Sequence, residues 1–356
     1  MAKVNMQPTA TVMEVFERLG PEPPRPRFAS TLEQFPLTLP PGKDIGRISA
    51  VSRGPNGDVY MFNPPNGGAY IPRDPEMRLP YIVHFDSEGR YLNGWGPDRV
   101  PEVDGVSQWP DSAENVEVDA AGDVWVTGWN YNDHAILRFS ADGEFLRRYG
   151  QKGVMGDNDD TEWFNRPPSV YHDVENHELF VADGYGNNRV IAVDSETGEF
   201  TRMWGAYGKR PSSLSDEEAF GILHKIARSP DGLIYICDRP KNRVQEFELV
   251  PGGVRYLREV TIAPGTLLMG SASDIAFTPD NKYLLVADMM AQRIWSVDRE
   301  TFEVLGWASA APETEGADNI GVNRTPLHRM TSLPNGDLLL ARGRKGVQRM
   351  TYLGVR

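Results

Sequence analysis

The chain has a single cysteine, Cys237, among its 356 residues, which excludes an intrachain disulfide. No apolar run approaches the roughly 20 residues that a membrane-spanning helix needs. The N-terminal segment, MAKVNMQPTATVMEVFERLG, also lacks the continuous apolar stretch of a secretion signal. We therefore expect no membrane contact and a cytoplasmic location.

Long basic runs are absent as well. The formal net charge is −13, and the densest basic stretch is the short GRKG at 343–346. Nucleic-acid binding depends on clustered Lys and Arg that neutralise phosphates, so we expect no nucleic-acid partner. What the chain has in quantity is turn-forming residues, with 35 glycines and 28 prolines.

These turns belong to a repeat of short strands. Two alternating apolar strands flank a turn rich in Asp, Asn and Gly, and in most copies two further strands follow. The turn positions are Gly57, Gly122, His177, Gly232, Asn281 and Gly336, spaced 65, 55, 55, 49 and 55 residues apart. Four short strands at this period predict an all-β protein, a six-bladed β-propeller.

The two ends of the chain complete this architecture. The last copy has three clear strands, so we expect a strand from the N-terminal side, FPLTL at 35–39, to close the ring and cover the sheet edges. Residues 1–30 are then an N-terminal arm and linker, with a short helix over 13–20, and residues 31–356 form the propeller.

The innermost strand of each blade lines the channel of a propeller, so equivalent positions form a ring around the axis. Counting back eight residues from each turn position gives Ser49, Glu114, Ser169, His224, Ser273 and His328. Small and large polar side chains alternate in this ring. The three large ones therefore lie on alternate blades, where they converge on the axis.

Two imidazoles and a carboxylate that converge in this way are typical of a metal site. Glu114, His224 and His328 are the predicted ligands of a divalent transition metal, zinc first, with iron or manganese as alternatives. In the simpler alternative the two histidines bridge channel waters and Glu114 is a local counter-charge.

The remaining histidines have simpler interpretations. His84 lies in an alternating strand and is expected to be half-exposed, and His172 and His177 belong to a strand and its turn. His134 follows a turn near the channel end, where it is either a second-shell residue or an ordinary surface residue. Asp183, Asp238 and Asp288 each end a second strand and are expected to cap turns.

Several segments resemble a known family, the NHL-type six-bladed propellers, and among them the catalytic core of peptidyl-α-hydroxyglycine α-amidating lyase. The likeness spans roughly 105–343 and is sharpest at VADGYGNNRVIAVD (181–194). CDRPKNRVQEF (237–247) follows an Ala-Asp-Arg-x-x-x-x-Arg pattern of that family. The LH pairs at 223–224 and 327–328 match its Pro-His pairs.

The resemblance implies a metal-dependent lyase that cleaves the C–N bond of a carbinolamide. The three zinc histidines of the family fall on Glu114, His224 and His328, so one ligand is changed. Its catalytic tyrosine matches Tyr185, the base on the substrate hydroxyl, and one of its arginines matches Arg239, a clamp for a carboxylate or carbonyl oxygen.

Three departures from the family restrict this interpretation. A second arginine belongs near 62–65, where FNPP stands. Arg329 occupies the position of an aspartate beside the structural calcium, so it becomes a second-shell residue and the calcium site is in doubt. Gly186 replaces a disulfide cysteine. We therefore expect a small-molecule substrate other than a peptide hormone.

Two other functions stay open. A metal in the same channel could activate water for hydrolysis of a lactone, ester or amide. A propeller can also be a non-catalytic scaffold that binds a protein partner through its loop faces, for which 131–134 and 204–218 are candidates, although these loops could equally form a lid.

Overall fold

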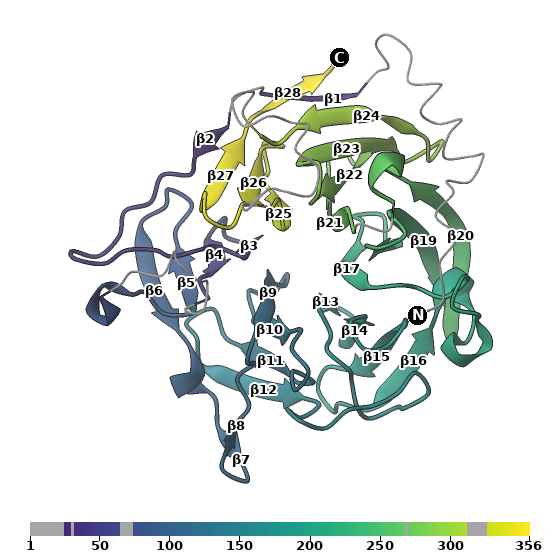
Figure 1. Ribbon diagram of the computed structural model, residues 1–356, viewed down its shortest axis with the longest axis horizontal. Helices are drawn as coiled ribbons and strands as arrows, with labels where there is room; N and C mark the ends of the chain where they lie inside the picture. Colours follow the sequence, from purple (N-terminus) through teal and green to yellow (C-terminus); the bar gives the residue numbers. More distant parts are fainter. Residues whose placement is uncertain (1–24, 30–31, 65–73, 268–269, 312–325) are drawn as a thin grey trace.

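The architecture is a closed ring of sheets around a central channel (Figure 1). The computed structural model describes residues 25–29, 32–64, 74–267, 270–311 and 326–356. These residues form six four-stranded antiparallel sheets, each with its first strand at the channel. The predicted six-bladed propeller is confirmed.

The first five blades are each formed by four consecutive strands. Blade 1 contains β3 (Ala50–Arg53), β4 (Val59–Phe62), β5 (Ile82–Phe85) and β6 (Tyr91–Trp95); blade 2 contains β9 (Ala113–Val118), β10 (Val124–Gly128), β11 (Ile136–Phe139) and β12 (Phe145–Tyr149). Blade 3 contains β13 (Ser169–Asp173), β14 (Glu178–Asp183), β15 (Arg189–Asp194) and β16 (Phe200–Trp204); blade 4 contains β17 (Leu223–Arg228), β18 (Ile234–Asp238), β19 (Arg243–Val250) and β20 (Gly253–Thr261). Blade 5 contains β21 (Ala272–Phe277), β22 (Tyr283–Asp288), β23 (Arg293–Asp298) and β24 (Val304–Ser309).

The turn that joins the first two strands of each blade needs a left-handed residue. All six predicted turn positions have positive φ: Gly57 (87°), Gly122 (93°), His177 (52°), Gly232 (94°), Asn281 (57°) and Gly336 (89°). Glycine adopts this conformation without steric cost and asparagine tolerates it, which explains their use here. The shared conformation shows that the six copies are aligned correctly.

Blade 6 is closed by a strand from the N-terminal side of the chain. It contains β25 (Arg329–Ser332), β26 (Leu338–Ala341), β27 (Val347–Met350) and, as its outer strand, β2 (Glu33–Gln34). The closing strand was predicted at 35–39, and it lies slightly earlier. The Phe35 N–H still donates to the Val347 carbonyl at 3.0 Å, but Pro36 has no N–H, so the ladder ends there.

The two ends of the chain also pair with each other. β1 (Pro26–Phe28) forms an antiparallel pair with β28 (Tyr352–Val355) at the outer edge of the ring (Figure 1). Thr38, further along, bridges to Arg90 beside the outer strand of blade 1. The segment that follows the arm therefore links blades 6 and 1. The helix predicted over 13–20 lies outside the described residues.

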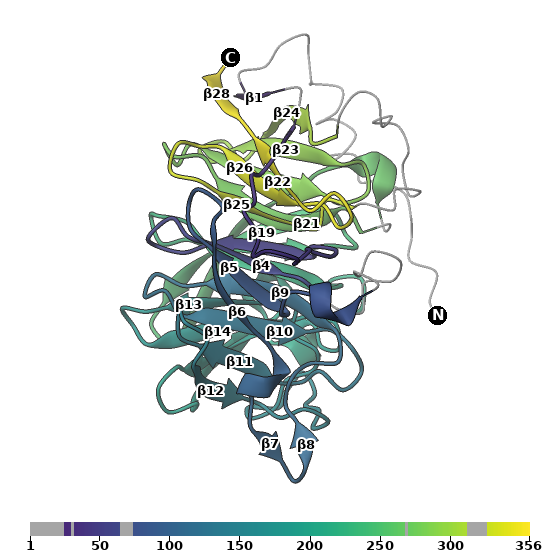
Figure 2. The same ribbon diagram turned by 90° about the vertical axis from the view of Figure 1, so that its left-hand side faces the viewer.

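A short hairpin projects from the ring beside blade 2. It pairs β7 (Glu102–Val103) with β8 (Val106–Ser107), and it extends away from the stacked sheets in Figure 2. The connecting 3₁₀ helices are η2 (Pro75–Met77), η3 (Pro97–Arg99), η4 (Ala206–Gly208), η5 (Pro211–Ser213) and η6 (Pro264–Thr266). No helix among the described residues is long and apolar enough to cross a lipid bilayer.

The hydrophobic core is divided among the spaces between blades. Six clusters of buried residues each join two neighbouring sheets, and the cluster around Phe35, Val51 and Leu339 joins blade 6 to blade 1. The inner strands also contact one another in sequence, including β25 with β3. Ring closure is therefore a packing contact as well as a hydrogen-bonded one.

We predict that Phe35→Ala weakens ring closure. Phe35 is 6% exposed and packs in the cluster between blades 6 and 1. Loss of a buried phenyl ring costs about 3–5 kcal/mol, which urea denaturation would measure. Phe200→Ala, at a 40% exposed position of β16, should change the free energy of unfolding by less than about 0.5 kcal/mol. Equal effects of the two variants would contradict this role of Phe35.

Candidate functional site

The channel ring predicted from the repeats is formed at the start of the inner strands. In three of the six blades the ring residue is the extra residue of a β-bulge: Glu114 in β9, His224 in β17 and Ser273 in β21. A bulge changes the direction of a side chain that regular alternation would place elsewhere. This local irregularity explains how a histidine at the mouth of a buried strand can face the axis.

The two ring histidines are held in the same way by the blade that follows each of them. Nδ1 of His224 lies 2.6 Å from the Ser273 carbonyl oxygen, and Nδ1 of His328 lies 2.7 Å from the Ser49 carbonyl oxygen. A carbonyl can only accept, so each Nδ1 carries the proton and donates it. Nε2 of the neutral ring is then the nitrogen with the lone pair, which is the tautomer a metal ligand needs.

The two imidazoles also lie against each other. Their ring centroids are 5.2 Å apart and their planes cross at 81°. His224 is fully buried, whereas His328 is partly exposed to the cavity described below. Two of the three predicted ligands are therefore neighbours, although 104 residues separate them in the sequence.

The third predicted ligand is placed only by its backbone. Glu114 lies in β9 of blade 2, one blade removed from the blades of His224 and His328 in the alternating order. Its side chain is outside what the structure describes. Among the side chains that are described, no three of His, Cys, Asp or Glu gather closely enough to hold a metal. The complete set of Glu114, His224 and His328 stays a prediction.

A cavity of about 470 Å³ opens at the channel mouth beside His328. Its lining comes from all six blades and from the segments that lead into them: Arg47, Ser49, Phe62, Pro64, Tyr81, Asp111, Ser112, Ala113, Trp129, Tyr185, Arg239, Met289, Pro326 and His328. The cavity therefore contains one of the two histidines and both residues predicted to act on a substrate.

Tyr185 and Arg239 form a contacting pair in this cavity. Arg239 Nη1 donates to the Tyr185 hydroxyl oxygen at 3.1 Å, and the guanidinium also lies 5.6 Å from the centre of the phenol ring. The Tyr185 ring centroid is 6.1 Å from that of His224. The phenol is thus located between a cationic donor and the histidine pair.

The loop that carries Tyr185 is fixed by a buried ion pair. Asp183 and Arg189 have fully buried side chains, with Arg189 Nε 2.9 Å from Asp183 Oδ2. Asp183 Oδ1 accepts the Asn165 N–H at 2.7 Å, and the Gly186 N–H donates to the Asn165 carbonyl at 3.0 Å. Asp288 likewise accepts the N–H groups of two turn residues, Met290 and Ala291. The predicted turn-capping role is confirmed for Asp288. Asp183 and Asp238 instead accept the N–H groups of Asn165 and Gly221, which precede the first strand of their blades.

Sequence reasoning missed a second cavity arginine. An arginine was expected near 62–65, but Arg47 lines the cavity from the segment before β3, while Phe62 and Pro64 form part of the apolar wall. The Gly46 N–H donates to Asn63 Oδ1 at 2.9 Å, which ties this segment to the end of β4. The sequence did offer one signal for Arg47, namely its position two residues before the ring residue Ser49.

Arg329 lies beneath the histidine pair. This buried guanidinium donates to the His224 carbonyl at 2.8 Å and to the Pro168 carbonyl at 3.0 Å. It is also the sequence neighbour of His328, so it touches the backbone of both histidines. A cationic side chain thus satisfies two carbonyls at the position where the resembled family has an aspartate.

His134 is not among the described residues that line the cavity. It is buried in the loop after β10, burial lowers its pKa below the ordinary value, and the nearby charges are those of Asp133, Asp183 and Arg166. Its second-shell role stays a prediction.

The expectation for His84 was wrong. The side chain is 5% exposed, stacks on Tyr60 with ring centroids 4.0 Å apart, and hydrogen-bonds Asp58 at 3.0 Å. Neighbouring side chains on the same face of the sheet bury His84, and the alternating pattern of its strand alone does not predict that burial.

His172 belongs to a buried network that resembles a catalytic triad. Its Nδ1 lies 2.6 Å from Asp119 Oδ2 and its Nε2 lies 3.0 Å from Ser195 Oγ. Ser195 is fully buried, however, and the Trp125 indole also donates to Asp119. The network is closed to substrate and fastens blade 2 to blade 3.

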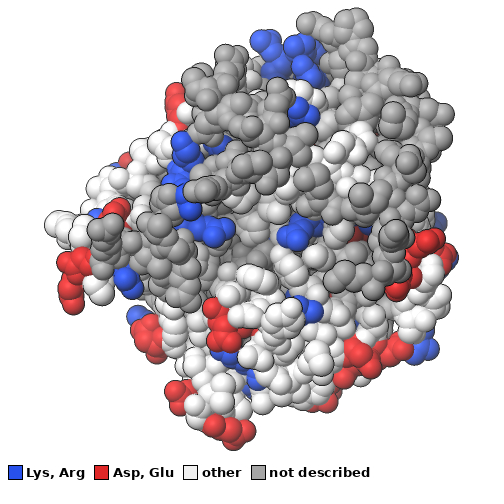
Figure 3. Space-filling view, viewed as in Figure 1, with Lys and Arg blue, Asp and Glu red and all other residues white. Residues whose placement is uncertain are grey.

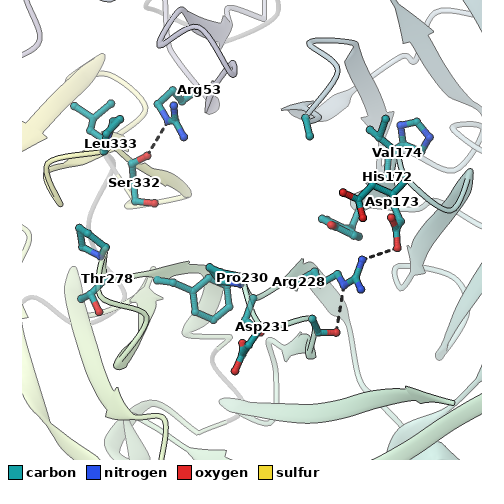
Figure 4. A pocket seen from close by; sticks show the side chains of 18 residues that line it. Arg53, His172, Asp173, Val174, Arg228, Pro230, Asp231, Thr278, Ser332 and Leu333 are labelled. Atoms are coloured by element: carbon teal, nitrogen blue, oxygen red, sulfur yellow. Dashed lines mark hydrogen bonds and ion pairs between the residues drawn. The ribbon is translucent and has the colours of Figure 1, made fainter.

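The opposite mouth of the channel has a larger hollow of about 950 Å³ (Figure 4). Arg228 faces it but is paired with Asp173 at 2.5 Å, and Arg53 donates to the Ser332 carbonyl at 3.2 Å. Between the two mouths, Lys225 bridges Glu117 at 3.1 Å and Asp274 at 3.8 Å. The protein's own groups therefore satisfy most of the charges below the histidines.

The charge on the visible face is uneven. Viewed down the axis, some Lys and Arg atoms lie near the centre and in the upper part of the visible face, while Asp and Glu atoms lie mainly along its left, lower and right edges (Figure 3). The Lys and Arg near the centre are therefore a local feature of a chain whose net charge is −13.

Comparison with known proteins supports the likeness drawn from the motifs. No family model matches the chain. Human NHL repeat-containing protein 3 is 25% identical over 261 residues, which cover 72% of this chain and 68% of that protein. A probable peptidyl-alpha-hydroxyglycine alpha-amidating lyase of Caenorhabditis elegans is 24% identical over 297 residues, 77% of each chain. The predicted resemblance is confirmed.

Solved structures confirm the fold. A streptogramin B lyase structure aligns with a TM-score of 0.54 at 15% identity, covering 90% of this chain and 97% of that one. The propeller domain of Swd1 from Myceliophteria thermophila aligns with a TM-score of 0.53 at 9% identity. At these identities the match concerns the propeller architecture alone.

We predict that Arg189→Leu destabilises the protein by about 3–5 kcal/mol, because it leaves the Asp183 charge buried without its cation. Chemical denaturation would measure the loss. Arg255→Leu is the matched control, since it breaks an exposed pair with Glu248 that is worth at most about 1 kcal/mol. An Arg189→Leu protein as stable as the control would exclude this ion pair as the support of the Tyr185 loop.

Proposed function

We propose that the protein is a metal-dependent lyase that cleaves the C–N bond of a small carbinolamide. The observation that carries the proposal is that His328 lines the same cavity as the Tyr185–Arg239 pair. The second carbonyl-anchored histidine, His224, is buried directly against both His328 and Tyr185. The similarity to a probable amidating lyase over most of the chain supports the same class of reaction.

The residues present suit a divalent transition metal. Both imidazoles donate through Nδ1, so both Nε2 atoms have the lone pair that coordination needs. With Glu114 as the third ligand, two nitrogens and one carboxylate oxygen form a set that zinc accepts with a position left for substrate, and iron or manganese also bind such sets. When bound, the metal supplies Lewis-acid stabilisation of negative charge on a substrate oxygen.

The chain's own residues account for the proton transfers. In a carbinolamide R–CO–NH–CH(OH)–R′, the Tyr185 phenolate takes the hydroxyl proton and the O–C electron pair forms the carbonyl. The C–N bond breaks at the same time and its electron pair goes to nitrogen, to which Tyr185 returns the proton that it took, so the phenolate is regenerated. The products are R–CO–NH₂ and R′–CHO, so no water or oxidant is consumed. The Arg239 guanidinium stabilises the phenolate form through its hydrogen bond.

The two arginines of the cavity determine how a substrate is oriented. Arg239 and Arg47 both line the cavity, and both can bind a carboxylate through paired N–H donors. We propose that R′ is a carboxylate, as in an N-acyl-α-hydroxyglycine. Arg47 then contributes, from a different segment, the second guanidinium that the motif comparison did not find.

We predict about one bound zinc, iron or manganese per chain, measured by plasma mass spectrometry after metal reconstitution. His224→Gln and His328→Ala should each lose it, because each removes a nitrogen ligand. His177→Asn is the control, since this exposed turn histidine has a φ of 52° that asparagine tolerates. Circular dichroism would establish that the variants are folded. Absence of metal from the folded wild type would overturn the metal-dependent mechanism.

We predict turnover of α-hydroxyhippurate to benzamide and glyoxylate, followed by chromatography. Tyr185→Phe should lower kcat about 10²–10⁴-fold with little change in KM, because it removes the proton acceptor and little of the contact area. Tyr131→Phe, at a 79% exposed position, should keep the wild-type rate. Undiminished turnover by Tyr185→Phe would exclude this mechanism, and cleavage of lactones or esters in place of the carbinolamide would favour hydrolysis.

A further inference from the structure

We infer that the cavity has a separate apolar subsite, centred on Trp129, that binds a hydrophobic or aromatic acyl group of the substrate. This inference rests on the proposed function for the identity of the acyl group, but the subsite itself is read from the cavity. It adds a substrate class, N-aroyl and related hydrophobic N-acyl compounds, to the reaction proposed above.

The lining of the cavity combines apolar and polar surface. Phe62, Pro64 and Tyr81 of blade 1 and Trp129 of blade 2 supply apolar surface, as do Met289 and Pro326 near blades 5 and 6. The polar groups come from Tyr185, Arg239 and His328 and, on the side of blades 1 and 2, from Arg47, Ser49, Asp111 and Ser112. A ligand that fills about 470 Å³ therefore meets aromatic and charged side chains together, and Trp129 is the aromatic ring that lies next to Tyr185.

The backbone that carries the exposed Trp129 side chain is held by several contacts. The backbone N–H of Trp129 donates to the Ser112 carbonyl at 3.1 Å. A Cβ at the preceding Gly128 would lie 2.6 Å from the Pro110 Cβ and 2.7 Å from the Asp133 Cβ, so only glycine permits this close packing. The buried Asp133 carboxylate accepts the N–H groups of Asp111, Ser112 and Asn130 at 2.7–3.0 Å. The backbone is therefore fixed before any ligand binds.

The indole itself is placed for stacking. It is 44% exposed, and among the described residues its ring contact is with Tyr185, at 6.0 Å between centroids and 41° between planes. A tryptophan side chain on a fixed backbone has only two rotatable bonds, so it loses little conformational entropy when a planar group packs against it. Its contact with the proposed base puts that planar group next to the reacting carbon, which is where the R–CO–NH of a carbinolamide lies.

Tyr131 does not share this role. It is 79% exposed but does not line the cavity, and its ring is already covered on one side by the Arg166 guanidinium at 5.0 Å. Trp129 is therefore the residue of this loop that we expect to determine acyl-group preference.

The test compares equilibrium binding of two unreactive probes by isothermal titration calorimetry. N-benzoylglycine and N-acetylglycine have the same amide and carboxylate and differ only in the acyl group. We expect the wild type to prefer the benzoyl compound by about tenfold or more. Trp129→Ala should reduce this ratio to about two- to threefold, whereas Trp129→Phe should retain most of it. Phe200→Ala, an exposed aromatic on the outer strand β16, should leave the ratio unchanged.

The outcomes separate this inference from the proposed function. An unchanged ratio in Trp129→Ala, or binding of neither probe to the wild type, would overturn the subsite. A Trp129-dependent preference without turnover of α-hydroxyhippurate would support the subsite and refute the lyase. Turnover of α-hydroxyhippurate without a Trp129-dependent preference would support the lyase and refute the subsite.

Discussion

Packing of each sheet against its two neighbours is the constraint on which the molecule depends. The described residues include no helical layer to cover a sheet, so both faces of every blade are buried by other blades, and six apolar clusters fill the spaces between them. This arrangement works only as a closed ring, which is why β2 and Phe35 return to β27. It also brings the starts of all six inner strands to one axis, so residues as distant as Arg47, His224 and His328 come to one channel mouth.

The convergence creates a second requirement, which concerns polar groups. Backbone carbonyls at the starts of the inner strands lie in a narrow buried channel, where an unsatisfied acceptor is costly. The imidazoles of His224 and His328 satisfy the carbonyls of Ser273 and Ser49, and Arg329 satisfies those of His224 and Pro168. The same hydrogen bonds that hold the channel together therefore fix the imidazole tautomer that the proposed metal coordination needs. In this proposal, stability and function share these contacts.

The repeat predicted the fold and part of the site because it reflects local conformation. The six turn positions require positive φ, and five of them are Gly or Asn, so alignment on them placed His224 and His328 at equivalent positions, where the two rings are neighbours. Arg47 belongs to no repeat, and its place in the cavity depends on tertiary contact with the end of β4. The exposure of His84 was predicted wrongly because Tyr60 and Asp58 of the same sheet cover its side chain. Strand alternation tells which face a side chain takes, but not what covers that face.

The site divides its tasks between parts of the fold that tolerate change differently. His224 and His328 lie at the starts of inner strands, and their rings are tied to the backbone of neighbouring blades, so any change there disturbs the channel. Trp129, Tyr185 and Arg239 lie in loops that follow the second strands, supported from below by Asp133 and by the Asp183–Arg189 pair. Their exposed faces can change without loss of the core. In the proposed function, the metal ligands therefore belong to the strand ends, whereas the proton acceptor Tyr185 and the acyl-group contact of Trp129 belong to loops that can vary without loss of the core.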